Sequence, residues 1–126
     1  MEVMPRIQRL IVYIKYLYQM VEPIREKYPD KFKIYTTKAD RKLLIHTKLV
    51  IIDNVYLSIG SANWDRRSMT ADPELNADVV DGDTVKSPEG VTVGKLPREF
   101  RLRKYQEMTG LSYEELDAMT FIEAAD

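Results

Sequence analysis

Six residues that could do chemistry or shape a site stand at fixed offsets around the only histidine of the chain. Residues 46–63 read HTKLVIIDNVYLSIGSAN, which follows the pattern H-x-K-x(4)-D-x(6)-G-S-x-N. The pattern is carried by His46, Lys48, Asp53, Gly60, Ser61 and Asn63. Six matches at fixed spacing within two apolar runs are an improbable coincidence in 126 residues, so we interpret this stretch as a catalytic signature.

His46 and Lys48 lie two residues apart in a predicted strand, so their side chains project from the same face. An ammonium group beside an imidazole repels a metal cation but suits an anion such as a phosphodiester, so we expect no metal site here. The neutral imidazole can act as a nucleophile and its protonated form as an acid near neutral pH. Ser61 and Asn63 can donate further hydrogen bonds to phosphoryl oxygens.

Two signature positions are expected to be structural. Gly60 lets the backbone approach its neighbours closely. Asp53 and Asn54 are ordinary hairpin-turn residues at the far end of the strand from His46, so we expect Asp53 to shape the turn without touching the substrate. A histidine taken alone is more often a surface or core residue, and only the surrounding pattern favours catalysis by His46.

The elements that position these residues follow from hydrophobic periodicity. Apolar residues at helical spacing predict one amphipathic helix from Pro5 to Tyr28, and the alternation in residues 31–37 predicts a short strand. The aliphatic run of residues 43–52 predicts a strand buried on both faces. After the turn, residues 55–59 return as its hairpin partner.

The rest of the chain alternates between loops and regular elements. Residues 64–72 are expected to be irregular, residues 75–80 to form a strand, and the glycine-containing stretch 82–94 to form a loop. A helix is predicted beyond Pro97 with its end at Gly110. Ser112 and Glu115 form a capping box for a last helix that reaches Phe121.

Composition restricts the class of protein. The length predicts a single domain over residues 1–126, and a formal net charge of -1 gives no general attraction for nucleic acid. The absence of cysteine excludes disulfides and thiolate chemistry. Because the first 20 residues show neither a signal peptide nor a membrane span, we expect a cytoplasmic protein, with peripheral membrane contact as an option.

At the signature the sequence resembles the phospholipase D superfamily, whose HKD motif it matches at every position. The similarity continues through NWDRRSM, DPEL and PREFRLRKYQEMTG, and is greatest to the C-terminal HKD half of eukaryotic-type phospholipases D. The resemblance implies an α/β fold in which a mixed β-sheet is flanked by helices. By comparison with the family, the chain is expected to be half of a phospholipase D-like fold, truncated at its N-terminus.

The resemblance also implies a metal-independent reaction without a cofactor. One motif's histidine attacks phosphorus to form a phosphohistidine, and the other motif's histidine protonates the leaving group. In the family a carboxylate downstream of the histidine orients its ring, and Glu74 stands at that position. The implied activity is hydrolysis of a phospholipid headgroup, such as phosphatidylcholine to phosphatidic acid and choline.

The chain contains one HKD motif, whereas the implied reaction uses two. The second motif is expected from a homodimer partner or from a missing half of a longer enzyme. One alternative is a homodimeric HKD endonuclease acting on DNA or RNA, which the net charge makes less favoured. Another is an inactive half-domain fragment with an interaction role.

Overall fold

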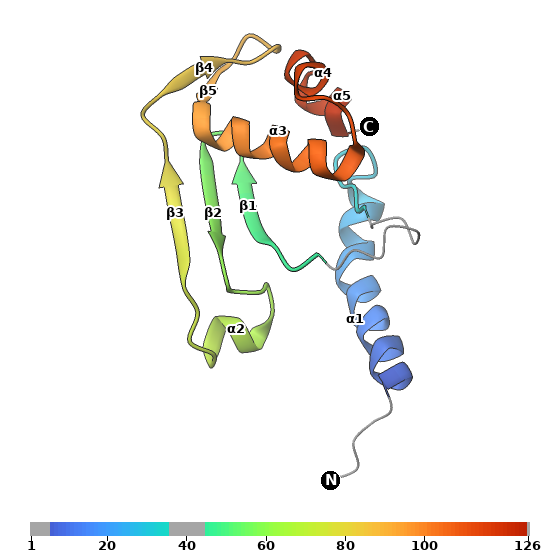
Figure 1. Ribbon diagram of the computed structural model, residues 1–126. Helices are drawn as coiled ribbons and strands as arrows, with labels where there is room; N and C mark the ends of the chain where they lie inside the picture. Colours follow the sequence, from blue (N-terminus) through green and yellow to red (C-terminus); the bar gives the residue numbers. More distant parts are fainter. Residues whose placement is uncertain (1–5, 36–44, 126) are drawn as a thin grey trace. The chain divides into compact units, whose positions relative to one another are not determined.

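The computed structural model describes residues 6–35 and 45–125, and the chain divides into two compact units, Met1–Lys42 and Leu43–Asp126 (Figure 1). In the first unit, helix α1 covers Arg6–Lys27 with Pro23 inside it, as predicted. The strand predicted for residues 31–37 is wrong over residues 31–35, and residues 36–37 lie outside the described part. The amides of Lys31 and Phe32 both donate to the carbonyl of Tyr28, which makes a turn, and residues 6–35 contain no strand for this segment to pair with.

The second unit contains a three-stranded antiparallel sheet in the order β1, β2, β3. Its strands are β1 (Lys48–Ile52), β2 (Tyr56–Gly60) and β3 (Asn76–Val80). The predicted hairpin partner and third strand are confirmed within one residue at each end. The first strand, predicted over residues 43–52, begins only at Lys48, because β2 pairs no further than Gly60, which lies opposite Lys48. Residues 45–47 are irregular and residues 43–44 lie outside the described part, so no strand holds His46 and Lys48 on one face as predicted. β1 is only half-buried, because it is an edge strand, whereas the prediction had it buried on both faces.

Two segments predicted as irregular contain regular structure. Helix α2 (Arg66–Thr70) lies within the predicted loop 64–72, and the Asp65 carboxylate caps it by accepting from the Ser68 amide at 2.8 Å. The predicted loop 82–94 contains a small hairpin of β4 (Thr84–Lys86) and β5 (Thr92–Gly94). Elements of three to five residues are too short for a hydrophobic period to show.

The C-terminal helices follow the predicted caps. Helix α3 (Lys95–Thr109) ends at Gly110, whose φ of 83° is the left-handed conformation that glycine adopts readily. Ser112 and Glu115 form the capping box of α4 (Tyr113–Ala118). The prediction of one last helix reaching Phe121 is wrong, because α4 ends at Ala118, Met119 is extended, and a separate helix, α5 (Phe121–Ala125), follows.

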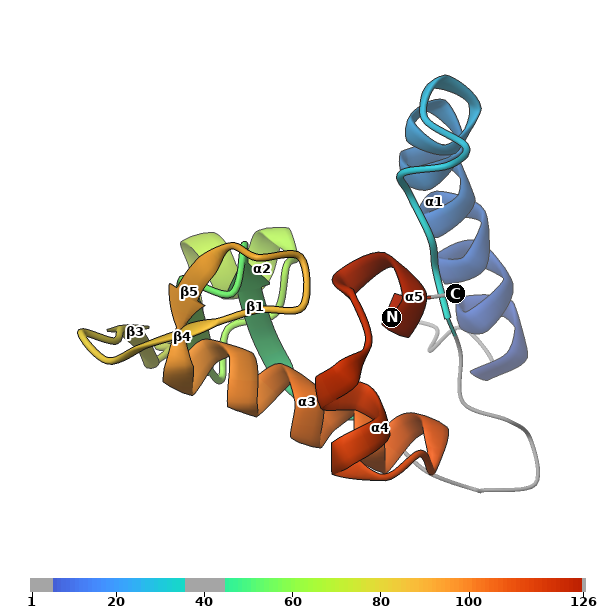
Figure 2. The same cartoon turned by 90° about the horizontal axis from the view of Figure 1, so that it is seen from above.

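The buried hydrophobic residues of the second unit come from β2, β5, α3 and α4: Leu57, Val93, Leu102 and Leu116. Figures 1 and 2 show α3 crossing the sheet near the end that carries the β1–β2 turn. Antiparallel sheets flanked by helices confirm the predicted α/β class. No helix in the described ranges, 6–35 and 45–125, is both long and apolar enough to cross a bilayer.

Candidate functional site

The strand register gathers the signature at one end of the sheet. Lys48 pairs with Gly60, and Gly60 pairs with Asn76, so the three residues form one row across β1, β2 and β3. The chain segments that continue past this row carry His46, Ser61, Asn63 and Glu74. We call this the signature end of the sheet; α2 lies beside it (Figure 1). Residues that are distant in the sequence therefore lie at the same end of the sheet, because β2 pairs with β1 on one side and with β3 on the other.

His46 is exposed and lies in the irregular segment directly before β1. The Lys48 ammonium donates to the His46 carbonyl oxygen at 2.8 Å, which holds its charge beside the histidine backbone. The imidazole itself makes no hydrogen bond to any described residue. The imidazole is therefore accessible to a ligand, and the ammonium group lies beside the backbone of the same residue.

Ser61 and Glu74 are joined directly. The Ser61 hydroxyl donates to a Glu74 carboxylate oxygen at 2.6 Å and accepts from the Leu75 amide at 3.0 Å. The bond from Ser61 lowers the pKa of Glu74 most, a bond from Ser68 adds to it, and the Lys48 charge lowers it further. Glu74 is thus held as a carboxylate at the signature end.

The structure does not join Glu74 to His46. The carboxylate is bonded to Ser61, and Ser68 and the Lys48 charge lower its pKa further. The expected role of Glu74 in orienting the imidazole therefore stays a prediction. The geometry instead makes Glu74 the group that ties the loop after β2 to the segment before β3.

Close packing explains why position 60 is a glycine. A Cβ atom there would lie 2.1 Å from Asn76 Oδ1 and 2.4 Å from the Leu75 carbonyl oxygen. The Asn76 side chain passes over Gly60 and accepts from the Ala62 amide at 3.2 Å. Only glycine leaves room for this crossing, so Gly60 sets the path of the backbone that leads to Ser61 and Asn63.

Asn63 lines a hollow of about 490 Å³ beside β1. Lys48 and Asn76 also line it, as does Trp64, whereas His46 does not. Lysine, amide and hydroxyl groups without a carboxylate suit an anionic group such as a phosphate. The hollow is large enough for a small headgroup phosphodiester.

Asp53 lies where the sequence predicts, in the turn at the opposite end of β1 from His46. Asp53 and Asn54 both have φ of 53°, the left-handed values of a tight hairpin turn. Asn54 is buried, and its side chain accepts from Arg101 Nε of α3 at 2.8 Å. The turn therefore fastens the sheet to α3, far from the signature end.

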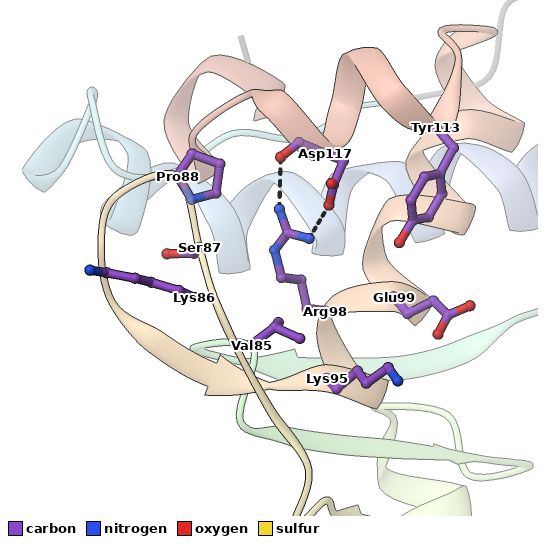
Figure 3. A pocket seen from close by; sticks show the side chains of 9 residues that line it. All are labelled: Val85, Lys86, Ser87, Pro88, Lys95, Arg98, Glu99, Tyr113 and Asp117. Atoms are coloured by element: carbon purple, nitrogen blue, oxygen red, sulfur yellow. Dashed lines mark hydrogen bonds and ion pairs between the residues drawn. The ribbon is translucent and has the colours of Figure 1, made fainter.

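A second hollow, of about 480 Å³, lies between the β4–β5 hairpin and helices α3 and α4 (Figure 3). In it the buried Arg98 reaches across to Asp117, whose carboxylate and carbonyl both accept from the guanidinium. None of the six signature residues lines this hollow. Its ion pair joins α3 to α4 and is structural.

Three residues of the site were not anticipated from the sequence: Ser68, which lowers the pKa of Glu74; Asn76, which crosses Gly60; and Trp64, which lines the hollow. Asn76 could have been found by pairing the strands, because it falls opposite Gly60. Nothing in the sequence pointed to Ser68 as a site residue, since the helix that carries it, α2, was not predicted. Among residues 6–35 and 45–125 no group of three histidine or carboxylate side chains is placed to hold a metal ion.

Comparison with known proteins gives two kinds of similarity. Residues 15–89, more than half of the chain, match the family described as "Cardiolipin synthase, PLD-like domain". Over 49 residues the chain is 43% identical to Phospholipase D alpha 1 of Ricinus communis, and equally so to Phospholipase D alpha 2 of Arabidopsis thaliana. The matched stretch is 38% of this chain and 6% of each relative. No solved structure matches.

Proposed function

Because the chain belongs to the phospholipase D-like domain family of phosphodiesterases, we propose that it hydrolyses the headgroup phosphodiester of a phospholipid, with phosphatidylcholine as substrate. The printed names of the two plant relatives support a phospholipid substrate. These relatives are far longer than the matched stretch, so the substrate is carried over as a proposal. The assignment of this chain to the C-terminal half of such enzymes also stays a prediction.

The observation that carries the proposal is the row of Lys48, Gly60 and Asn76 across the sheet. This register puts an accessible imidazole, an ammonium group and amide and hydroxyl donors at the same end of three strands. Such a set can bind a phosphate and supply a nucleophile at once. A hollow lined by Lys48 and Asn63 adjoins it.

In the proposed first step the neutral imidazole of His46 attacks phosphorus. An N–P bond forms, the P–O bond to choline breaks, and the leaving oxygen takes a proton from a second imidazolium. Lys48 and Asn63 stabilise the charge that grows on the phosphoryl oxygens. In the second step water forms a P–O bond, the N–P bond breaks, and the second imidazole accepts the proton of water.

The second imidazole comes from another HKD motif, because one histidine cannot be nucleophile and acid in the same step. We propose two sources, a second copy of this chain or the other half of a longer enzyme. With a second copy, activity per chain rises with protein concentration until the dimer saturates. With a separate half, activity appears only when that half is added.

Choline release from phosphatidylcholine vesicles tests the proposal. We expect His46→Asn to abolish release and Lys48→Ala to lower it about 10²-fold or more, because a charge-stabilising donor is removed. Val80→Ala, an exposed change at the other end of β3, serves as the matched control. Choline release that persists in the His46→Asn protein would contradict the proposal.

Cleavage of single-stranded DNA, measured with the same preparations, distinguishes the endonuclease alternative. The net charge of -1 predicts weak nucleic-acid binding. Cleavage of DNA without choline release would contradict a phospholipid substrate and support the endonuclease alternative. Absence of both activities at all concentrations, with and without an added half, would favour the inactive fragment.

A further inference from the structure

The two most exposed large hydrophobic side chains among the described residues both lie at the signature end of the sheet. Leu75 is 81% exposed and Trp64 is 80% exposed. Leu75 directly follows Glu74, and Trp64 directly follows Asn63. Large apolar side chains so exposed in a folded domain mark an interaction surface when they gather at one place.

Two neighbours extend this apolar character. Met69 on α2 is 59% exposed, and Ile45, next to His46, is 58% exposed. All four residues lie in the segments that continue past the Lys48–Gly60–Asn76 row, so they surround the same end of the sheet. We call these four residues the apolar rim.

Charges around the apolar rim are balanced within the described segments 45–48 and 61–76. The basic side chains there are Lys48, Arg66 and Arg67, and the acidic ones are Asp65, Asp72 and Glu74. Arg67 and Asp72 form an ion pair at 2.8 Å, and Asp65 caps α2. A surface with equal numbers of both signs has no net attraction for an anionic membrane, but it fits a headgroup layer that is itself zwitterionic.

We propose that the apolar rim is a membrane-binding surface that inserts Trp64 and Leu75 into the headgroup layer of a phosphatidylcholine bilayer. Tryptophan favours this layer because its ring is apolar and its N–H needs a polar partner. The choice of lipid rests on the proposed function. Docking in this way brings the phosphodiester of a bilayer lipid to His46 without removing the lipid from the membrane.

Trp64 is the only tryptophan of the chain, so its fluorescence reports on the apolar rim directly. We expect its emission to move to shorter wavelength when phosphatidylcholine vesicles are added, and to be quenched by brominated acyl chains. High salt should leave the shift unchanged, because the charges are balanced. Emission that does not respond to vesicles overturns the proposal.

Leu75→Ala gives an independent test by vesicle sedimentation. We expect about ten-fold weaker binding, since most of an exposed leucine side chain is lost from the membrane contact. Val80→Ala, which changes a 73% exposed residue at the far end of β3, is the matched control and should bind as the parent does. Equal weakening by both changes would contradict a surface restricted to the signature end.

Activity on two forms of the substrate keeps this inference separate from the proposed function. Leu75→Ala should lower choline release from vesicles but leave release from short-chain, monomeric phosphatidylcholine unchanged. Vesicle binding without any choline release would support the membrane-binding surface and contradict the proposed hydrolysis of phosphatidylcholine. A Trp64 shift that depends on protein concentration and not on vesicles would show that a second copy covers the rim, which overturns the membrane proposal.

Discussion

Gly60→Ala is the change whose effect can be worked out most fully from the structure. The added methyl would lie 2.1 Å from Asn76 Oδ1, 2.5 Å from Asn76 Cγ and 2.4 Å from the Leu75 carbonyl oxygen. All three are far inside an ordinary contact of 3.4–4 Å, so the atoms must move apart by about an ångström or more. The Leu75 oxygen belongs to the backbone and cannot move by rotating a side chain.

Two hydrogen bonds depend on that geometry. The Ala62 amide donates to Asn76 Oδ1 at 3.2 Å, and the Ser61 amide donates to the Leu75 carbonyl at 3.0 Å. Each such bond contributes about 1 kcal/mol, and overpacking by a methyl group costs about 1–3 kcal/mol. Because water can replace part of both bonds at this exposed site, we expect a loss of about 2–3 kcal/mol in the free energy of unfolding.

Urea denaturation of Gly60→Ala measures this loss, with Gly82→Ala as its control. A Cβ at Gly82 meets nothing within 4 Å, so that change should be nearly neutral. Adding Asn76→Ala to Gly60→Ala removes two of the three close contacts, and the pair should be less destabilising than the sum of the single changes. Equal stabilities of the Gly60→Ala and Gly82→Ala proteins would refute the packing explanation of this signature glycine.

Other predictions concern the supports of the site. Arg101→Ala should lower the free energy of unfolding by about 2–4 kcal/mol, because the buried side chain of Asn54 loses its partner, and a double-mutant cycle with Asn54→Ala should show positive coupling. Asp117→Ala should cost about 1–3 kcal/mol by denaturation, since Arg98 stays buried with one pairing group lost; no change would make the pair unimportant. The pKa of Glu74 should lie below its ordinary value of 4.5. Because the folded-state pKa is the lower one, the stability from its bonds is present above the unfolded-state pKa and is lost as pH falls through the folded-state value. A carboxyl NMR titration midpoint at or above 4.5 would contradict this.

Much of the fold could be predicted from the sequence where the local signal was strong. Helix α1 has six turns of apolar repeat, the caps of α3 and α4 are explicit, and the Asp-Asn turn fixes the β1–β2 hairpin. Segments of three to five residues were missed, because α2, β4 and β5 are formed by caps and pairing partners and not by periodicity. The alternation of apolar and polar residues in 31–35 led to a wrong strand prediction, because a strand forms only where a neighbouring strand can pair with it.

The residue types of the candidate site come from the sequence pattern and their roles stay predictions, whereas most contacts between them are visible only in the structure. The spacing of His46, Lys48, Ser61 and Asn63 indicated a phosphate site, and the register gathers those segments at one end of the sheet. The bond between Ser61 and Glu74 could not be predicted, because it depends on how a loop folds back after β2. The crossing of Asn76 over Gly60 likewise depends on pairing between strands 16 residues apart.

The proposed chemistry rests most directly on a covalent bond between phosphorus and His46. Mixing the protein with short-chain phosphatidylcholine, quenching within one turnover and mapping the adduct by mass spectrometry would detect that bond. The expected result is a phosphatidyl group on His46, with release of one choline per adduct and no adduct in His46→Asn. Choline release that proceeds at the same rate with no adduct on His46 would contradict it.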